Sequence, residues 1–233
     1  EAYDNLIQAI RIAQDLRVRL PVMVCMDGFI ISHSIERMEL LEDHEVRNFV
    51  GSYIAQYPLL DTDHPVTYGP VDLQNYYTEH KRQQVEGMQQ ARLVILEAGR
   101  KFRALSGREY GFFQEYRLKD AEIALVALGS ACGTMQVVVD ELRTEGVRAG
   151  LLKLRTFRPF PWEELCRSLK HLKALAVMDR SDSFGAFGGP VFNEVRAALF
   201  EAPSFPKTIN YIYGLGGRDV SLEDIRQVYR RLE

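Results

Sequence analysis

From residue 121 onward, short apolar runs alternate regularly with amphipathic segments, and this order constrains the fold more than any other feature. The apolar runs are 121–128, 147–154, 173–178 and 208–213. The amphipathic segments are 135–146, 162–172, 191–200 and 221–232. Continuous apolar runs of this length are typical of parallel strands buried on both faces. Four strands alternating with four helices predict an α/β domain whose mainly parallel sheet is covered by helices on both faces.

The first part of the chain has a less regular pattern. Residues 1–15 have the apolar spacing of a helix, and 22–26 (VMVCM) read as a buried strand that ends at Asp27. A short helix is expected at 43–49 and a long one at 80–106, which Ser106-Gly107 terminates. Gly99 inside the long helix predicts a close packing contact, because glycine otherwise weakens a helix. The chain opens within a helical pattern and without methionine, so we expect further sequence upstream.

Residues 53–77 show little periodicity and contain three prolines and several tyrosines. A structureless run of this length is uncommon inside a compact domain. Its composition is neither low in complexity nor highly charged, which argues against disorder. We therefore expect an extended connector that packs against another surface, such as a partner subunit.

Composition excludes several function classes. The net charge is −3 and the pI is about 6.0, so the chain lacks the basic excess of a nucleic-acid or anionic-membrane binder. No apolar run has the roughly 18 residues of a membrane helix. Cys25, Cys132 and Cys166 are far apart and form no metal-binding spacing. We expect them to be reduced, buried residues of an intracellular, cytoplasmic protein.

Loops at the carboxyl ends of parallel strands are where such domains meet ligands or partners. Residues 129–133 (GSACG) follow a strand and open a helix, which suits an anion, but they lack a complete dinucleotide or Walker pattern. A tight turn is the ordinary interpretation there. Asp179-Arg180 is either a local ion pair or part of a ligand or partner surface. The glycine-rich stretch 214–219 (GLGGRD) is either a turn or an interface loop.

Asp27, Ser32 and His33 raise the possibility of a hydrolase triad. Neighbouring side chains on an extended loop should diverge, so Ser32 and His33 should not form the required pair. Nor does the sequence contain a nucleophile elbow around Ser32. The residues taken alone therefore predict a fold and several interface-like loops, but no complete catalytic set.

Four stretches resemble one enzyme family. They are 20–29 (LPVMVCMDGF) with Ser32-His33, then 63–69 (DHPVTYG), 105–111 (LSGREYG) and 213–219 (YGLGGRD). In this order they are similar to the alpha subunit of the pyruvate:ferredoxin oxidoreductases, which belong to the thiamine-diphosphate-dependent 2-oxoacid oxidoreductases. The resemblance covers nearly the whole chain, and the second stretch points to pyruvate more than to 2-oxoglutarate.

The resemblance implies that the chain is divided into three parts. Residues 1–50 would be the carboxyl-terminal part of a thiamine-diphosphate-binding (pyrimidine) domain. Residues 51–117 would be an extended connector and long helix, and residues 118–233 an α/β domain similar to the carboxyl-terminal domain of transketolase. The family's catalytic glutamate and its pyruvate-binding threonine and arginine lie upstream of the matching region, so no catalytic, cofactor-binding or metal-binding residue carries over.

The resemblance also implies an activity and partners. The complete enzyme would form acetyl-coenzyme A from pyruvate with thiamine diphosphate, magnesium, iron–sulfur clusters and coenzyme A, and would pass electrons to ferredoxin. Partners would be beta, gamma and delta-type subunits in an oligomer, and this chain alone would be inactive and would bind no cofactor tightly. The alternative is a stand-alone interaction module without catalysis. The expected interface residues are Asp27, Ser32, His33, Asp179, Arg180, Gly214, Gly216, Gly217, Arg218 and Asp219.

Overall fold

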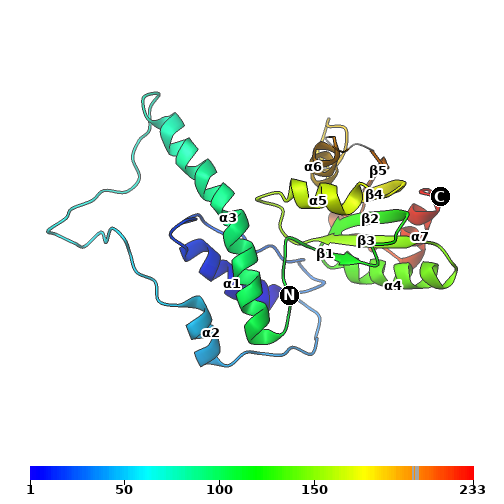
Figure 1. Cartoon of the computed structure of the whole chain (residues 1–233), viewed down its shortest axis with the longest axis horizontal. Coiled ribbons are helices and arrows are strands. Elements are labelled where there is room, and N and C mark those ends of the chain that lie inside the picture. Colours follow the sequence, from blue (N-terminus) through cyan, green and yellow to red (C-terminus); the bar gives the residue numbers. More distant parts are fainter. Residues whose placement is uncertain (201, 203–204) are drawn as a thin grey trace. The chain divides into compact units, whose positions relative to one another are not determined.

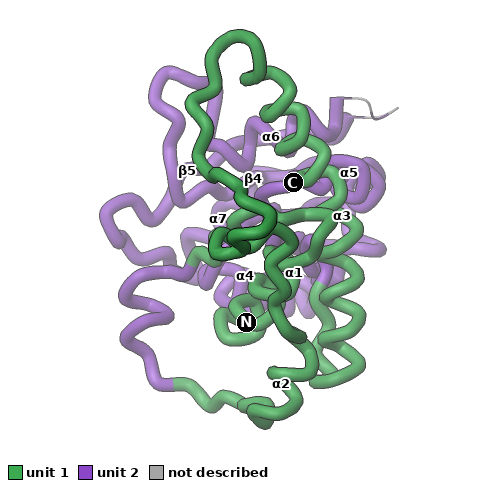
Figure 2. The backbone as a smooth tube through the Cα atoms, turned by 90° about the vertical axis from the view of Figure 1, so that its left-hand side faces the viewer, with its two compact units in different colours: residues 1–25, 36–110 green, residues 26–35, 111–233 purple. Residues whose placement is uncertain are grey.

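A computed structural model describes residues 1–200, 202 and 205–233. The chain forms two compact units, and each takes residues from separate parts of the sequence (Figure 2). Unit 1 contains residues 1–25 and 36–110, and unit 2 contains residues 26–35 and 111–233. Among the described residues, no helix combines the length and apolar character needed to cross a bilayer.

Unit 1 consists of three helices: α1 (Ala2–Gln14), α2 (Asp43–Val50) and α3 (Tyr77–Ser106) (Figure 1). Their apolar faces meet around Ile7, Phe49 and Phe102, and the two phenylalanine rings lie edge to face with centroids 5.3 Å apart. The three predicted helices are confirmed, although α3 starts three residues earlier than the pattern indicated. Gly107, with φ 74°, ends α3 in the left-handed conformation that favours glycine.

A buried carboxylate joins the two ends of unit 1. Asp4 accepts hydrogen bonds from Arg108 Nε at 2.6 Å, Arg108 Nη2 at 2.8 Å and Tyr110 Oη at 2.5 Å. Burial opposes ionisation of Asp4, but these hydrogen bonds outweigh it and lower its pKa. Tyr110 also explains Gly99, because a Cβ at position 99 would overlap the Tyr110 carbonyl oxygen. The predicted close packing at Gly99 is confirmed.

The predicted buried strand at residues 22–26 is wrong for this structure. The segment is irregular and exposed, and Met23 keeps 87% of its surface accessible. Its apolar residues suit a strand, but a strand also needs a neighbour for its backbone N–H and C=O groups, and residues 22–26 have none here. Cys25 is likewise exposed rather than buried, whereas Cys132 is buried and Cys166 is partly buried.

Unit 2 is built on a five-stranded sheet with the strand order β1-β3-β2-β4-β5. The strands are β1 (Phe113–Tyr116), β2 (Ile123–Leu128), β3 (Ala149–Leu154), β4 (Ala174–Asp179) and β5 (Lys207–Ile212). The helices are α4 (Ala131–Thr144), α5 (Trp162–Leu169), α6 (Pro190–Leu199) and α7 (Leu222–Arg230). Strands β2 to β5 are parallel, and central β2 pairs Ile123 with Ala149 on one side and with Ala174 on the other. The predicted parallel α/β fold is confirmed.

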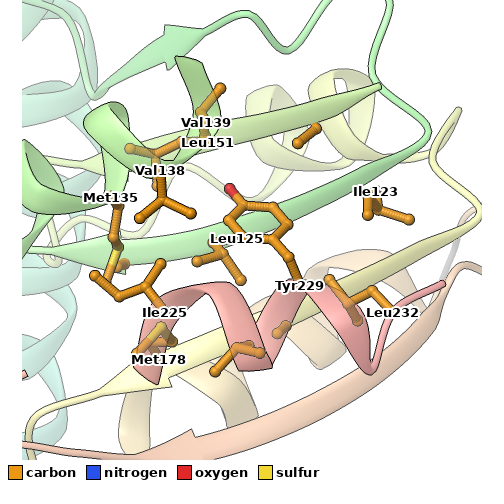
Figure 3. Close-up of a cluster of buried hydrophobic side chains, with 14 of the residues drawn as sticks. Ile123, Leu125, Met135, Val138, Val139, Leu151, Met178, Ile225, Tyr229 and Leu232 are labelled. Carbon is orange, nitrogen blue, oxygen red and sulfur yellow. The ribbon is translucent and has the colours of Figure 1, made fainter. Parts of the chain in front are cut away.

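Two apolar layers cover the two faces of this sheet. Helices α4 and α7 pack on one face and α5 and α6 on the other (Figure 1). Figure 3 shows the first layer, where Tyr229 of α7 lies among Leu125, Met135 and Leu151. The fully buried Tyr229 hydroxyl donates to the Gly150 carbonyl oxygen at 2.7 Å, which satisfies its polar atom inside the core.

Strand β1 is the one element of the sheet that the sequence pattern did not reveal. It pairs antiparallel with β3, with Phe113 opposite Leu154 and Tyr116 opposite Leu151. Its sequence, FQEY, is short and half polar because β1 lies at the edge of the sheet. Phe113 and Tyr116 each pack partly against an apolar layer of the core, but four residues are too few to display a strand period.

Candidate interface at the carboxyl ends of the strands

Asp27 lies at the carboxyl ends of two parallel strands of unit 2. Its Oδ2 accepts a hydrogen bond from the Ser130 amide at 2.9 Å, two residues after the end of β2. Its Oδ1 pairs with Arg180 Nη1 at 3.1 Å, directly after β4. We refer to Asp27, Ser130 and Arg180 as the Asp27 clasp. The clasp fastens the ten-residue segment 26–35 to the sheet of unit 2, while the flanking residues belong to unit 1.

Two glycines make room for the clasp. Gly129 has φ 84°, and a Cβ there would lie 3.3 Å from Asp27 Oδ2. Gly214 has φ 66°, and a Cβ there would lie 2.8 Å from Arg180 Nε. Both conformations are ones that other residues rarely adopt. The glycines after β2 and β5 therefore allow Asp27 and Arg180 to lie close against the backbone.

The Asp27 clasp also places a carboxylate at the turn formed by residues 129–133. The amino end of a helix attracts an anion, and at α4 that anion is the carboxylate of Asp27. Burial opposes ionisation of Asp27, but hydrogen bonds from Ser130 and the charge of Arg180 outweigh it and lower the pKa. The interpretation of this stretch as a tight strand-to-helix turn is supported, since the chain's own carboxylate takes the amide that a phosphate would need.

Asp179 lies outside the Asp27 clasp and forms hydrogen bonds with other residues. Its side chain is buried, and its two oxygens accept from the Val191 and Phe192 amides at 2.9 Å each. These amides open α6, so Asp179 links the end of β4 to the start of that helix. Burial raises the pKa of Asp179 and outweighs the two hydrogen bonds that would lower it. Because Arg180 pairs with Asp27, the alternative of a local Asp179–Arg180 ion pair is wrong.

Ser32 and His33 form a hydrogen bond, with Oγ 2.8 Å from Nδ1. The prediction that these side chains diverge is therefore wrong. The reason is a compact turn: Phe29 adopts φ 70°, its amide donates to Ser32 Oγ at 2.9 Å, and its ring stacks on His33 with centroids 4.7 Å apart. Among the described side chains, no carboxylate forms an ion pair with His33, so a Ser–His–Asp arrangement does not follow.

The loop 214–219 is an exposed turn after the edge strand β5. Gly214, Gly216 and Gly217 all have positive φ, at 66°, 64° and 81°. Arg218 and Asp219 are exposed and line a shallow depression of about 270 Å³ beside β5 and α7. This loop has the accessibility that a partner surface requires, whereas Asp179 does not.

Comparison with known protein families gives two matches in chain order. Residues 1–100 match the model described as "Pyruvate flavodoxin/ferredoxin oxidoreductase, thiamine diP-bdg". Residues 121–225 match "Pyruvate:ferredoxin oxidoreductase core domain II". The chain belongs to the pyruvate:ferredoxin oxidoreductase family. The two matches in this order confirm the resemblance inferred from the four sequence stretches.

Curated relatives in the pyruvate:ferredoxin oxidoreductase family agree with this assignment. Pyruvate synthase subunit PorA of Thermotoga maritima is 50% identical over 229 residues, which cover 98% of this chain and 58% of the relative. The Methanocaldococcus jannaschii PorA is 40% identical over 100% of this chain and 59% of the relative. Ketoisovalerate oxidoreductase subunit VorA of Pyrococcus abyssi is 34% identical over 98% and 57%. The chain thus spans less than two thirds of the length of these relatives.

The first family model is described as binding thiamine diphosphate. Such a diphosphate is held through a divalent cation with oxygen ligands. Within the described part of the chain, no three histidine, cysteine, aspartate or glutamate side chains converge as cation ligands would. The anion position at α4 is taken by Asp27. None of the described residues is assigned to the magnesium diphosphate group.

Sequence reasoning singled out Asp27 and Arg180 but did not find that they contact each other. They are 153 positions apart, and Ser130 is 103 positions from Asp27. The one local signal was the Asp27-Gly28 pair directly after an apolar run. It marks the end of a segment but carries no information on which strand ends the carboxylate reaches.

Proposed function

We propose that this chain is a component of a pyruvate synthase, the enzyme that oxidises pyruvate with coenzyme A and ferredoxin. The net reaction converts pyruvate, coenzyme A and two oxidised ferredoxins into acetyl-coenzyme A, carbon dioxide, a proton and two reduced ferredoxins. The observation that carries the proposal is the 50% identity to a pyruvate synthase subunit over 98% of the chain. Identity to a ketoisovalerate oxidoreductase subunit is lower, at 34%, which favours pyruvate as the 2-oxoacid.

The complete enzyme would contain thiamine diphosphate, magnesium and iron–sulfur clusters in addition to coenzyme A. Beta, gamma and delta-type subunits of a cytoplasmic oligomer would hold the groups that this chain does not. Its three cysteines are separated in sequence and differ in burial, which supports the placement of iron–sulfur clusters elsewhere.

We assign this chain mainly to assembly. In our proposal residues 1–50 are the end of a pyrimidine-binding domain, 51–117 a connector with a long helix, and 118–233 a transketolase-like carboxyl-terminal domain. The exposed turn 28–33 and the loop 214–219 would contact other parts of the complex. The fixed Ser32–His33 hydrogen bond and the Asp27 clasp support this assignment, because both hold an exposed turn in one conformation.

Pyruvate-dependent reduction of a low-potential dye tests the proposal. The complex would be assembled once with residues 1–233 and once with the product of the complete reading frame. We expect coenzyme-A-dependent reduction with the complete product and none with residues 1–233. No pyruvate-dependent reduction with the complete product would overturn the proposed reaction, and full reduction with residues 1–233 would overturn the assembly role.

A stand-alone interaction module is the alternative in a different class. Such a module would bind partner subunits without supporting pyruvate-dependent reduction in any assembly. Calorimetric titration with thiamine diphosphate and magnesium adds a second readout that is independent of turnover. Tight binding by residues 1–233 alone would contradict the assignment of the cofactor to other parts of the enzyme.

A further inference from the structure

The segment between α2 and α3, residues 51–76, is a long loop without helix or strand in unit 1, drawn in cyan in Figure 1. We call it the arm. Loops of this length inside compact proteins are usually binding elements or disordered linkers. We assign the arm to the binding elements if its composition, its charge and its local order all match those of a contact surface.

The arm exposes far more apolar surface than a solvated loop does. Leu60, Val71 and Ile54 keep 91%, 89% and 79% of their surface accessible. The exposed large apolar and aromatic side chains of the arm are Tyr53, Ile54, Tyr57, Leu59, Leu60, Tyr68, Val71, Leu73 and Tyr76. Single exposed apolar residues are normal, but nine large ones within the 26 residues of the arm favour an interaction site. Tyrosine in particular is enriched at protein interfaces.

The arm also has one sign of charge. Between Asn48 and His80 the sequence contains no lysine or arginine, although the chain as a whole has 29. The arm carries Asp61, Asp63 and Asp72 over the same stretch. A partner surface is therefore electrostatically complementary to the arm only if lysine or arginine side chains surround the apolar pockets of the partner.

Local hydrogen bonds give the arm defined turns. Asp61 accepts from the Asp63 amide at 3.2 Å, from the His64 amide at 3.3 Å and from His64 Nδ1 at 3.1 Å. Asp72 contacts His80, and the Tyr76 amide donates to the Leu73 carbonyl oxygen at 3.2 Å. A segment that is partly ordered before binding loses less conformational entropy when it docks.

We propose that the arm docks on a different subunit of the proposed pyruvate synthase, on apolar pockets bordered by lysine and arginine. The inference rests on the proposed function, because that function supplies the other subunits. A second copy of this chain is a poorer match, since its 32 acidic residues exceed its 29 basic ones and give a net charge of −3. The tyrosines and leucines fill the pockets, and the three aspartates face the basic border.

Binding of the complete chain to its purified partner subunits tests the proposal without any measurement of turnover. Leu60→Asp and Val71→Asp each place a charge at the expected centre of contact. We expect each to weaken association at least about 10-fold, which is the loss expected at an interface hot spot. Val137→Asp is the matched control, because Val137 is exposed on α4 of unit 2. It should change association less than about 2-fold.

Two variants of Asp63 test the contribution of charge to the docking of the arm. Asp63→Lys reverses a charge in the arm while leaving Asp61, the acceptor of the local turn, in place. We expect Asp63→Lys to slow association several-fold at low salt and to reduce its salt dependence, whereas Asp63→Asn should have a smaller effect. Equal association rates for wild type and Asp63→Lys would contradict a basic border.

A photo-reactive phenylalanine analogue at position 60 identifies the occupant. A cross-link to a lysine- or arginine-containing segment of another subunit supports the proposal. A cross-link to a second copy of this chain, or none in the assembled complex, would overturn it. Circular dichroism should show unchanged folding, because the substituted side chains are exposed. If the cross-link formed but the complex showed no pyruvate-dependent reduction, the result would count against the proposed reaction and not against the docking.

Discussion

The Asp27 carboxylate and the Arg180 guanidinium lie 3.1 Å apart, although 153 positions separate them in the chain. Both side chains are mostly shielded from water, with 20% and 26% of their surface exposed. Shielding strengthens the pair relative to a surface ion pair. This contact, together with the Ser130 amide, is what attaches segment 26–35 to unit 2.

Removing the charge of Asp27 should loosen that segment. We expect Asp27→Asn to lower the free energy of unfolding by about 1.5–3 kcal/mol, the loss of a hydrogen bond to a charged group. Hydrogen exchange of residues 26–35 should accelerate, while exchange in the central strands of the sheet should not. A double-mutant cycle with Arg180→Met should give a coupling of about 0.5–2 kcal/mol. The exposed pair Arg230–Glu223 is the control, with an expected coupling below about 0.5 kcal/mol.

Gly214→Ala should destabilise unit 2 for two reasons. The residue has φ 66°, and the added Cβ would displace Arg180. Strain at one residue of this kind costs about 1–3 kcal/mol in the free energy of unfolding. Gly133→Ala is the matched control, because Gly133 lies in α4 with no atom within 4 Å of an added Cβ. That change should be neutral or stabilise by up to about 1 kcal/mol, and chemical denaturation measures both.

Asp4 should make the stability of unit 1 depend on acid pH. Its pKa is lowered in the folded state from 3.8, so its contribution is fully present above pH 3.8 and is lost as pH falls below that value. Asp4→Asn should destabilise by about 1.5–3 kcal/mol at pH 7, because Arg108 loses its buried charged partner and keeps only the exposed Glu39. The difference between wild type and variant should shrink as pH falls below 3.8. Denaturant titrations at several pH values would show a constant difference if Asp4 were not responsible.

Asp179→Ala should cost more stability than the loss of an exposed helix cap. Two buried amides at the start of α6 would lose their acceptors, at a cost of about 2 kcal/mol or more. Ser221→Ala removes an exposed cap of α7, and its expected cost is about 1 kcal/mol. Thermal unfolding of the two variants would reveal equal losses if Asp179 were only a surface residue.

Local pattern was sufficient for most of the secondary structure. The apolar runs that became β2, β3 and β4 are buried on both faces, so each is recognisable without its neighbours, whereas β5 lies at the sheet edge and is only partly buried. Ser221 and Asp224 are three positions apart in the sequence and form the capping box that starts α7. The rule that a continuous apolar run forms a buried strand failed at residues 22–26, where the run has no neighbouring strand.

The sequence by itself determined the α/β class of unit 2, the helices of unit 1 and, through motifs in order, the family. Tertiary structure alone decided that Asp27 contacts Ser130 and Arg180, that Asp179 holds α6, and that Ser32 meets His33. Periodicity and caps depend on residues three or four positions apart, so a sequence displays them directly. A contact across 153 positions depends on which strand ends the fold brings together, and no local pattern encodes that choice.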